Sequence, residues 1–86
     1  MWIRSQDRKT LVNADKFSAS KEHEVFRIYS VNYFLGEYST EEKALKVMDM
    51  IEEAIIYCEA MMNIDSIIFD ERKMVLQMPK DDEVDV

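Results

Sequence analysis

Apolar and polar residues alternate along most of the first 38 positions, and a period of two predicts β-strands. The polar tetrad at 6–9 lies between two such stretches and is typical of a hairpin turn. Gly36, the only glycine of the chain, lies inside the last stretch, where it indicates a bulge or a close backbone approach. We expect an antiparallel meander with strands at 2–5, 10–14 (continued by 15–20), 24–31 and 33–38, and with a second turn at 21–23.

From residue 40 onward the apolar positions recur at intervals of three and four, which predicts one long amphipathic helix. Ser39 and Glu42 have the spacing of a capping box, in which the two side chains satisfy backbone amides at the start of a helix. No glycine, proline or other strong breaker follows until Asn63. The apolar positions form two neighbouring stripes, the first made of Ala44, Met48, Ile51, Ile55, Cys58 and Met62 and the second of Val47, Met50, Ala54, Tyr57 and Met61.

This apolar arc is wider than packing against one sheet requires. Either the C-terminal part of the chain covers the second stripe or a second copy does, so we expect a homodimer that forms through the helix. Two short apolar stretches, at 64–69 and 74–78, could supply the cover or add strands. Beyond Pro79, residues 80–86 are polar enough to predict a disordered acidic tail.

Together these elements predict a single α+β domain at residues 1–79. We expect an antiparallel sheet of three to five strands that packs against one long helix in the C-terminal half of the chain.

The 86-residue chain carries a net charge of −7, and the negative charge is concentrated in two places. Residues 40–62 hold six acids and two lysines, and residues 80–86 hold four acids and one lysine. A negative surface repels the backbones of nucleic acids, so we expect no direct binding to DNA or RNA. No apolar run has the length of a signal peptide or a membrane span, and a single cysteine forms no internal disulfide. These features predict a cytoplasmic protein without a membrane partner.

The sequence offers little for catalysis. His23 is the only histidine and falls in a predicted polar turn, where a solvated side chain is the simplest interpretation. Cys58 falls on the apolar stripe of the helix, where a thiol packs as a small hydrophobe. One histidine with one cysteine does not build a metal shell, and one glycine does not build a phosphate-binding loop. We therefore expect no enzyme, no cofactor and no bound metal, but a protein that acts by binding.

Two groups of residues are candidates for binding, and each has a simpler alternative. Carboxylates on the polar side of the helix could contact a partner protein, or they could be only the solvated side of an amphipathic helix. Cations and aromatic rings of the sheet could hold the phosphate and the base of a nucleotide, or the aromatic rings could belong to the core. The protein-binding candidates are Glu41, Asp49, Glu52, Glu53 and Glu59, and the ligand-binding candidates are Arg4, Arg8, Arg27, Tyr29 and Tyr33.

Three stretches of the chain resemble a family of small proteins of phages and prophages of Gram-positive bacteria. They are MWIRSQD at residues 1–7, LGEYSTEEKALKV at 35–47 and QMPKDDEV at 77–84. The resemblance implies a phage accessory protein in the cytoplasm of a host bacterium, where such proteins often act against host defence. We expect it to bind and inhibit a host protein, for example a CRISPR-type effector. The alternative is a sponge for a cyclic nucleotide or an ADP-ribose-type signal, and a weak enzyme or a structural phage component comes last.

Overall fold

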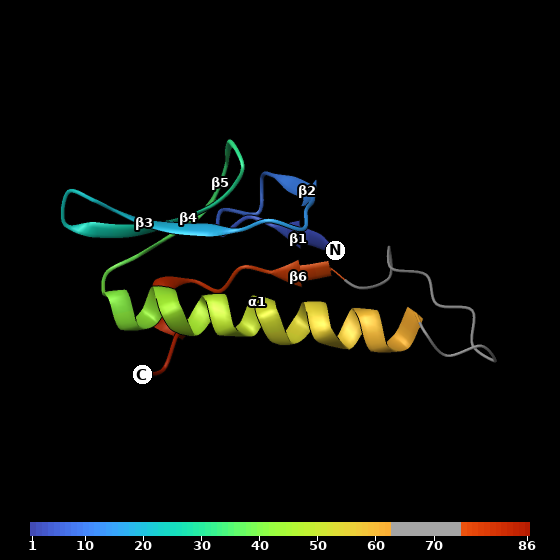
Figure 1. Cartoon of the computed structure of the whole chain (residues 1–86). Helices are drawn as coiled ribbons and strands as arrows, with labels where there is room; N and C mark the ends of the chain where they lie inside the picture. Colours follow the sequence, from blue (N-terminus) through green and yellow to red (C-terminus); the bar gives the residue numbers. More distant parts are fainter. Residues whose placement is uncertain (63–74) are drawn as a thin grey trace.

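The computed structural model describes residues 1–62 and 75–86 and has an α+β architecture, as the sequence predicts (Figure 1). Two three-stranded sheets lie on one side of a long helix. The elements in chain order are β1 (Trp2–Arg4), β2 (Leu11–Asn13), β3 (Ser18–Glu22), β4 (Val25–Ser30), β5 (Tyr33–Tyr38), α1 (Glu41–Met62), β6 (Val75–Gln77) and a short 3₁₀ turn η2 (Asp81–Glu83).

The sheet that we name sheet B is an antiparallel meander in the order β3-β4-β5. It matches the prediction for the last two strands, but β3 is a separate strand rather than a continuation of the second one. The turn after β3 lies at residues 23 and 24 rather than at 21–23, because Glu22 still pairs with Val25. His23 makes this turn with a positive φ of 59°.

Gly36 meets both expectations for a glycine inside a strand. The register between β4 and β5 shifts at Ile28 and Tyr29, opposite Gly36, so a bulge lies there. A Cβ atom on Gly36 would lie 3.1 Å from the Tyr38 hydroxyl oxygen and 3.2 Å from the Tyr38 ring. The missing side chain therefore lets the Tyr38 ring pack against the backbone of its own strand.

The second sheet, sheet A, has the order β2-β1-β6 and differs from the prediction of a single meander. β1 and β2 form the predicted antiparallel hairpin around the polar tetrad, whereas β6 pairs with β1 in parallel, Trp2 opposite Val75 and Arg4 opposite Gln77. Of the two apolar stretches expected after the helix, the second thus supplies a strand, while 64–69 lies outside the described residues. A three-residue strand with a distant partner leaves no periodic signal, so its pairing was not predictable.

The helix α1 begins one residue later than the capping prediction required. Thr40 caps it, because its Oγ1 accepts a hydrogen bond from the Lys43 amide at 3.2 Å. Ser39, the predicted cap, instead donates through its amide and its hydroxyl to the Asp81 carboxylate, at 2.8 and 2.9 Å. The buried positions are Ala44, Val47, Ile51 and Cys58, at intervals of three, four and seven, which is the helical spacing of the predicted apolar face.

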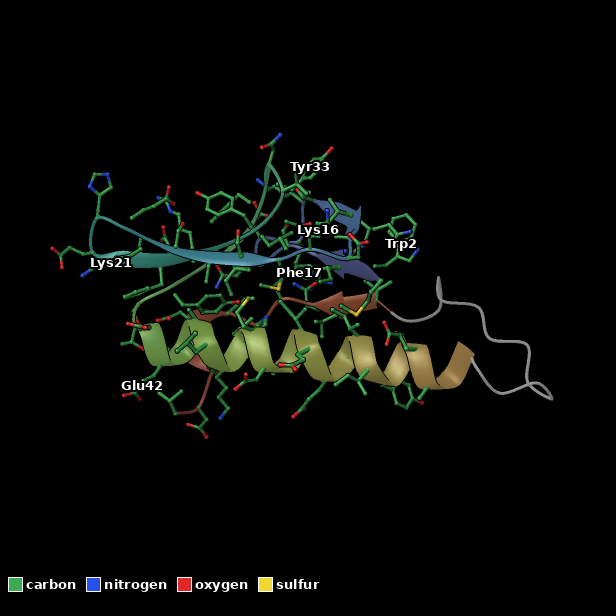
Figure 2. The ribbon with its side chains drawn as sticks, viewed as in Figure 1. Trp2, Lys16, Phe17, Lys21, Tyr33 and Glu42 are labelled. Atoms are coloured by element: carbon green, nitrogen blue, oxygen red, sulfur yellow. The ribbon has the colours of Figure 1, made fainter. Side chains whose placement is uncertain are left out.

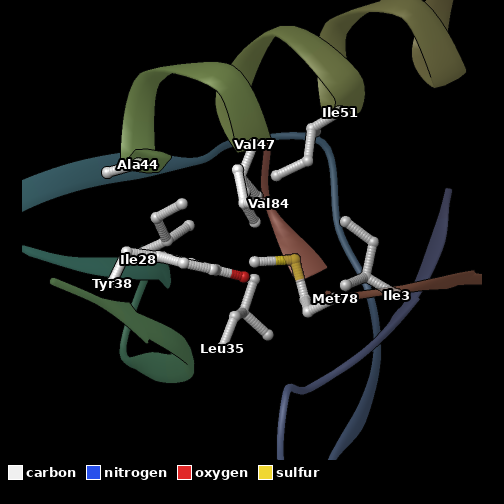
Figure 3. Packing of buried hydrophobic residues seen from close by; sticks show 9 residues of the cluster. All are labelled: Ile3, Ile28, Leu35, Tyr38, Ala44, Val47, Ile51, Met78 and Val84. Carbon is white, nitrogen blue, oxygen red and sulfur yellow. The ribbon is translucent and has the colours of Figure 1, made fainter. Parts of the chain in front are cut away.

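One apolar core joins both sheets, the helix and the C-terminal segment (Figure 3). Ile3 comes from sheet A, Ile28 and Leu35 come from sheet B, and Met78 and Val84 come from the chain after β6. The prediction of a disordered tail at 80–86 is wrong, since Val84 is only 6% exposed and contributes to the core. The prediction relied on the average polarity of the segment. A single valine that packs into the core is enough to hold the segment against the domain, and an average does not show it.

Hydrogen bonds fasten the C-terminal segment to the rest of the domain. The Tyr38 hydroxyl donates to the Pro79 carbonyl at 2.7 Å, and burial raises the pKa of Tyr38 well above its usual range, so it stays a donor. Lys43 Nζ donates to the Asp81 carbonyl at 2.9 Å, and Lys46 Nζ donates to the Asp85 carbonyl. Within residues 1–62 and 75–86, no helix has the length and hydrophobicity to cross a bilayer.

Candidate functional site

The five carboxylates predicted to bind a protein, Glu41, Asp49, Glu52, Glu53 and Glu59, are all exposed on α1. The two lysines of the helix form no ion pair with them. Lys43 and Lys46 both bond to the C-terminal segment, at Asp81 and Asp85. Among the described residues, none of the five carboxylates forms an ion pair. Within the described chain, α1 thus exposes five acids that have no ion-pair partner.

Two of these five carboxylates, Asp49 and Glu52, line a shallow hollow of about 280 Å³, which we name the acid-rimmed hollow. Phe17, from the connection between β2 and β3, is the one lining residue that does not come from the helix, and it lies between the strands and α1 (Figure 2). The rest of the wall is apolar and comes from one side of the helix. The complete lining is Phe17, Met48, Asp49, Ile51, Glu52, Ile55 and Ile56.

The other three predicted carboxylates do not lie in this hollow. At 100° per residue, Glu53 projects from α1 about 100° away from Glu52. Glu41 and Glu59 lie near the two ends of the helix, 11 and 7 positions from Glu52 along the sequence. The predicted acidic face is thus real as an exposed surface, but only its middle combines charge with an apolar cavity.

Large apolar side chains interrupt the acidic surface, and two of them were not predicted from the apolar pattern of the helix. Leu45 and Ile56 are 52% and 58% exposed and belong to neither predicted stripe. Both residues lie among the acidic residues of the helix pattern, and this position was the sequence signal that could have identified them as exposed. Met50 and Tyr57 of the second stripe are also exposed, at 36% and 52%, while Val47 of that stripe is buried. The predicted homodimer would cover Met50 and Tyr57, and it stays a prediction.

The predicted ligand-binding residues fall into three separate places. Arg27 and Tyr29 share the outer face of sheet B, as alternation in a strand requires. Tyr33 lies at the tip of the β4–β5 hairpin and is 56% exposed (Figure 2). Arg4 and Arg8 line a different hollow, on sheet A. No single site holds the five residues.

Arg27 is already occupied by carboxylates of its own chain. Its Nε donates to Glu37 Oε1 at 3.0 Å, and its NH1 lies 3.5 Å from Glu22 Oε2. The hydrogen bond to Glu37 raises the pKa of Arg27, and the hydrogen bond that Tyr29 donates to Glu22, 2.6 Å long, raises the pKa of Tyr29. One cation between two carboxylates leaves a net charge of −1, which does not attract a phosphate.

Cys58 and His23, the two residues that the sequence offered for catalysis, lie in different parts of the structure. Cys58 is buried, in keeping with a packing role, and His23 is exposed at a turn. No group of three or more histidine, cysteine, aspartate or glutamate side chains among these residues is arranged to hold a metal ion. Comparisons with protein-family models, with curated proteins and with solved structures gave no significant match. The chemistry of the described surface is therefore the basis for any assignment of function.

Proposed function

We propose that this protein acts by binding, without catalysis, and that it takes a basic segment of a partner protein in the acid-rimmed hollow between Phe17 and α1. The observation that carries the proposal is the acid-rimmed hollow, in which Asp49 and Glu52 flank an apolar cavity. A partner segment with an apolar side chain between two lysines or arginines matches this arrangement.

The chemistry of the hollow selects such a segment in two ways. Its apolar wall, from Phe17, Met48 and Ile55, gains from covering hydrocarbon, at roughly 25 cal/mol for each Å² removed from water. The carboxylates at its rim attract cations and repel acidic partners, which adds specificity more than affinity. The exposed Leu45 and Ile56 extend the apolar contact along the helix.

The net charge of −7 acts at longer range. It accelerates the encounter with a basic partner and slows the approach of nucleic acids. We propose a host bacterial protein as the partner, in keeping with the resemblance to small phage proteins, and inhibition of an anti-phage defence component as the biological outcome.

The test uses a fluorescently labelled helical peptide of lysine and leucine as the probe, with a glutamate and leucine peptide of the same length as its counterpart. Fluorescence anisotropy of the labelled peptide measures binding to the full chain. We expect saturable binding of the basic peptide and none of the acidic one. The double variant Asp49→Asn/Glu52→Gln should weaken binding at least about tenfold, which is about 1.4 kcal/mol of binding free energy.

Glu53→Gln provides the matched control on the same helix. It removes one negative charge from the exposed side of α1 but does not touch the acid-rimmed hollow. If Glu53→Gln weakened binding as much as Glu52→Gln alone, diffuse charge rather than the hollow would be responsible. Equal affinity for the basic and the acidic peptide would refute the proposal altogether.

A further inference from the structure

A second hollow, on sheet A, has the opposite charge. Its volume is about 450 Å³, and it is lined by Arg4, Arg8, Leu11, Val75 and Gln77. We name it the arginine hollow. The register of sheet A explains how three of these residues meet, because Arg4 lies directly opposite Leu11 on one side and Gln77 on the other. Ile3, the neighbour of Arg4, points to the core, so Arg4 points to the outer face of the sheet.

Arg8 reaches the same hollow from the β1–β2 turn. It has a positive φ of 69°, which is uncommon for a residue with a side chain. The turn is held by Ser5, whose backbone amide donates to the Thr10 carbonyl at 2.8 Å and whose carbonyl accepts from the Arg8 amide at 2.9 Å. The backbone of the turn thus fixes the point from which the Arg8 side chain starts.

The two guanidinium groups have no carboxylate partner among the described residues. Asp7, the acid nearest in sequence, is directed elsewhere. Its Oδ1 accepts from the Ser5 hydroxyl at 2.5 Å and from the Lys9 amide at 2.9 Å, and the first of these bonds lowers the pKa of Asp7. The chain has 18 acids and 11 basic residues, yet the described lining of this hollow has two arginines and no acid.

The residues beside these cations are partly apolar, and one of them is held in place. Gln77 Nε2 donates to the Ser5 carbonyl at 2.8 Å and to the Met78 carbonyl at 3.0 Å, so its side chain is held in place. Leu11 and Val75 supply apolar surface and are 47% and 45% exposed. The hollow thus joins two planar cations, which bind phosphate through paired N–H donors, to an apolar patch of the size of a small molecule.

We propose that the arginine hollow binds a small molecule that carries a phosphate or pyrophosphate group, with Arg4 and Arg8 as the phosphate ligands. This site is separate from the acid-rimmed hollow, and neither depends on the other. The phosphate can belong to a nucleotide or be inorganic, and the choice of probe distinguishes these sources.

Trp2 makes the test direct, because it is the only tryptophan and lies on the same face of β1 as Arg4, two residues away. Tryptophan fluorescence of the full chain is followed while pyrophosphate, ADP or adenosine is added at constant ionic strength. We expect saturable changes with pyrophosphate and ADP and none with adenosine. Tighter binding of ADP than of pyrophosphate would assign the site to nucleotides, and equal binding would assign it to the phosphate group alone.

Arg4→Gln and Arg8→Gln should each weaken binding at least about tenfold, since each removes one charge-assisted pair of hydrogen bonds. Arg4→Lys keeps the charge but loses the planar fork, and it should restore only part of the affinity. Lys21→Gln is the control of equal charge change, because Lys21 lies at the other end of the sheets from Trp2 (Figure 2). Circular dichroism checks that each variant is folded.

Two results would overturn the proposal. The first is no saturable signal with either phosphate probe up to about 10 mM, a concentration that corresponds to a negligible affinity. The second is equal weakening by Lys21→Gln and Arg4→Gln, which would show a response to overall charge rather than a site.

Discussion

The arginines of the two sheets differ in their surroundings: Arg27 lies on the outer face of sheet B, whereas Arg4 on the outer face of sheet A forms a pair with Arg8 of the β1–β2 turn. Arg27 lies between Glu22 and Glu37, with its guanidinium carbon 5.7 Å from the centre of the Phe34 ring. Arg4 and Arg8 have no acid beside them among the described residues and line a hollow instead. Among the described residues, Arg27 therefore has carboxylate partners, whereas Arg4 and Arg8 have none.

The register of each sheet produces this difference. Arg27 faces Glu37 across the β4–β5 pair, whereas Arg4 faces Leu11 and Gln77 across sheet A. Whether a charged side chain on a strand is paired within the protein thus depends on the residue opposite it, which can lie far away in sequence. The alternation along a strand shows on which face of the sheet a side chain lies, but it does not show which residue of the adjacent strand lies beside it.

The largest expected effects concern the core. If the two sheets are parts of one domain, substitutions of core residues in either sheet should destabilise the whole protein. Ile3→Ala on sheet A and Ile28→Ala on sheet B each remove a fully buried side chain. We expect each to lower the free energy of unfolding by about 2–5 kcal/mol, measured by urea denaturation. Leu11→Ala, on the exposed face of sheet A, should change it by no more than about 0.5 kcal/mol.

A small effect of Ile3→Ala, close to that of Leu11→Ala, would contradict a shared core. Sheet A would then be a loosely attached element, and its open arginines would need no explanation from ligand binding.

A smaller effect separates the two kinds of arginine directly. Arg27→Gln leaves Glu22 and Glu37 near each other without the cation between them, so we expect a decrease of about 2–4 °C in melting temperature. Arg4→Gln removes no bond to a described residue and should leave the melting temperature unchanged. Calorimetry of the two variants in low salt measures the melting temperatures. Equal melting temperatures would contradict the distinction between a structural Arg27 and an Arg4 without a structural role.

The smallest effect concerns the joint between the C-terminal segment and α1. Hydrogen bonds from the Ser39 amide and hydroxyl, aided by Lys43, lower the pKa of Asp81 below its usual value of 3.8. A carboxylate whose pKa is depressed by folding stabilises the protein above its unfolded pKa, and this contribution disappears as the pH falls through the folded pKa. Asp81→Asn should lower the melting temperature at pH 7 by about 1–2 °C.

The difference between wild type and Asp81→Asn should shrink as the pH falls below about 4. Melting curves at several pH values between 7 and 3 measure it. A difference that stays constant over this range would mean that the carboxylate charge of Asp81 plays no part in the joint. Asp82→Asn, an exposed neighbour, is the control.

Local patterns predicted most of the fold. The alternation of residues 24–38 gave β4 and β5, and the intervals of three and four gave α1 with its buried side at Val47 and Ile51. Patterns of this kind depend on neighbours a few residues apart, which the sequence displays. The pairing of β6 with β1 and the burial of Val84 depend on contacts between distant parts of the chain, and no local pattern contains them.

The candidate sites were predictable only in part for the same reason. The exposed acids of α1 follow from helical geometry, so all five were placed on the correct side. Asp49 and Glu52 line a hollow only because Phe17 packs over the helix from another part of the chain. The grouping of Arg27 with Arg4 and Arg8 failed because the sequence does not show which arginine has a glutamate opposite.

The order of the strands has a consequence for how the domain assembles. β3, β4 and β5 follow one another along the chain, so each pairing in sheet B closes a short loop. The pairing of Trp2 with Val75 closes a loop of almost the whole described chain, which costs more chain entropy and slows folding. The arginine hollow has walls from β1, from β6, from the β1–β2 turn and from β2, so it exists only after this slow closure. A phosphate compound would therefore bind only the folded protein, in which β1 and β6 are paired. By mass action, its binding would stabilise this pairing of two strands that are distant in the sequence.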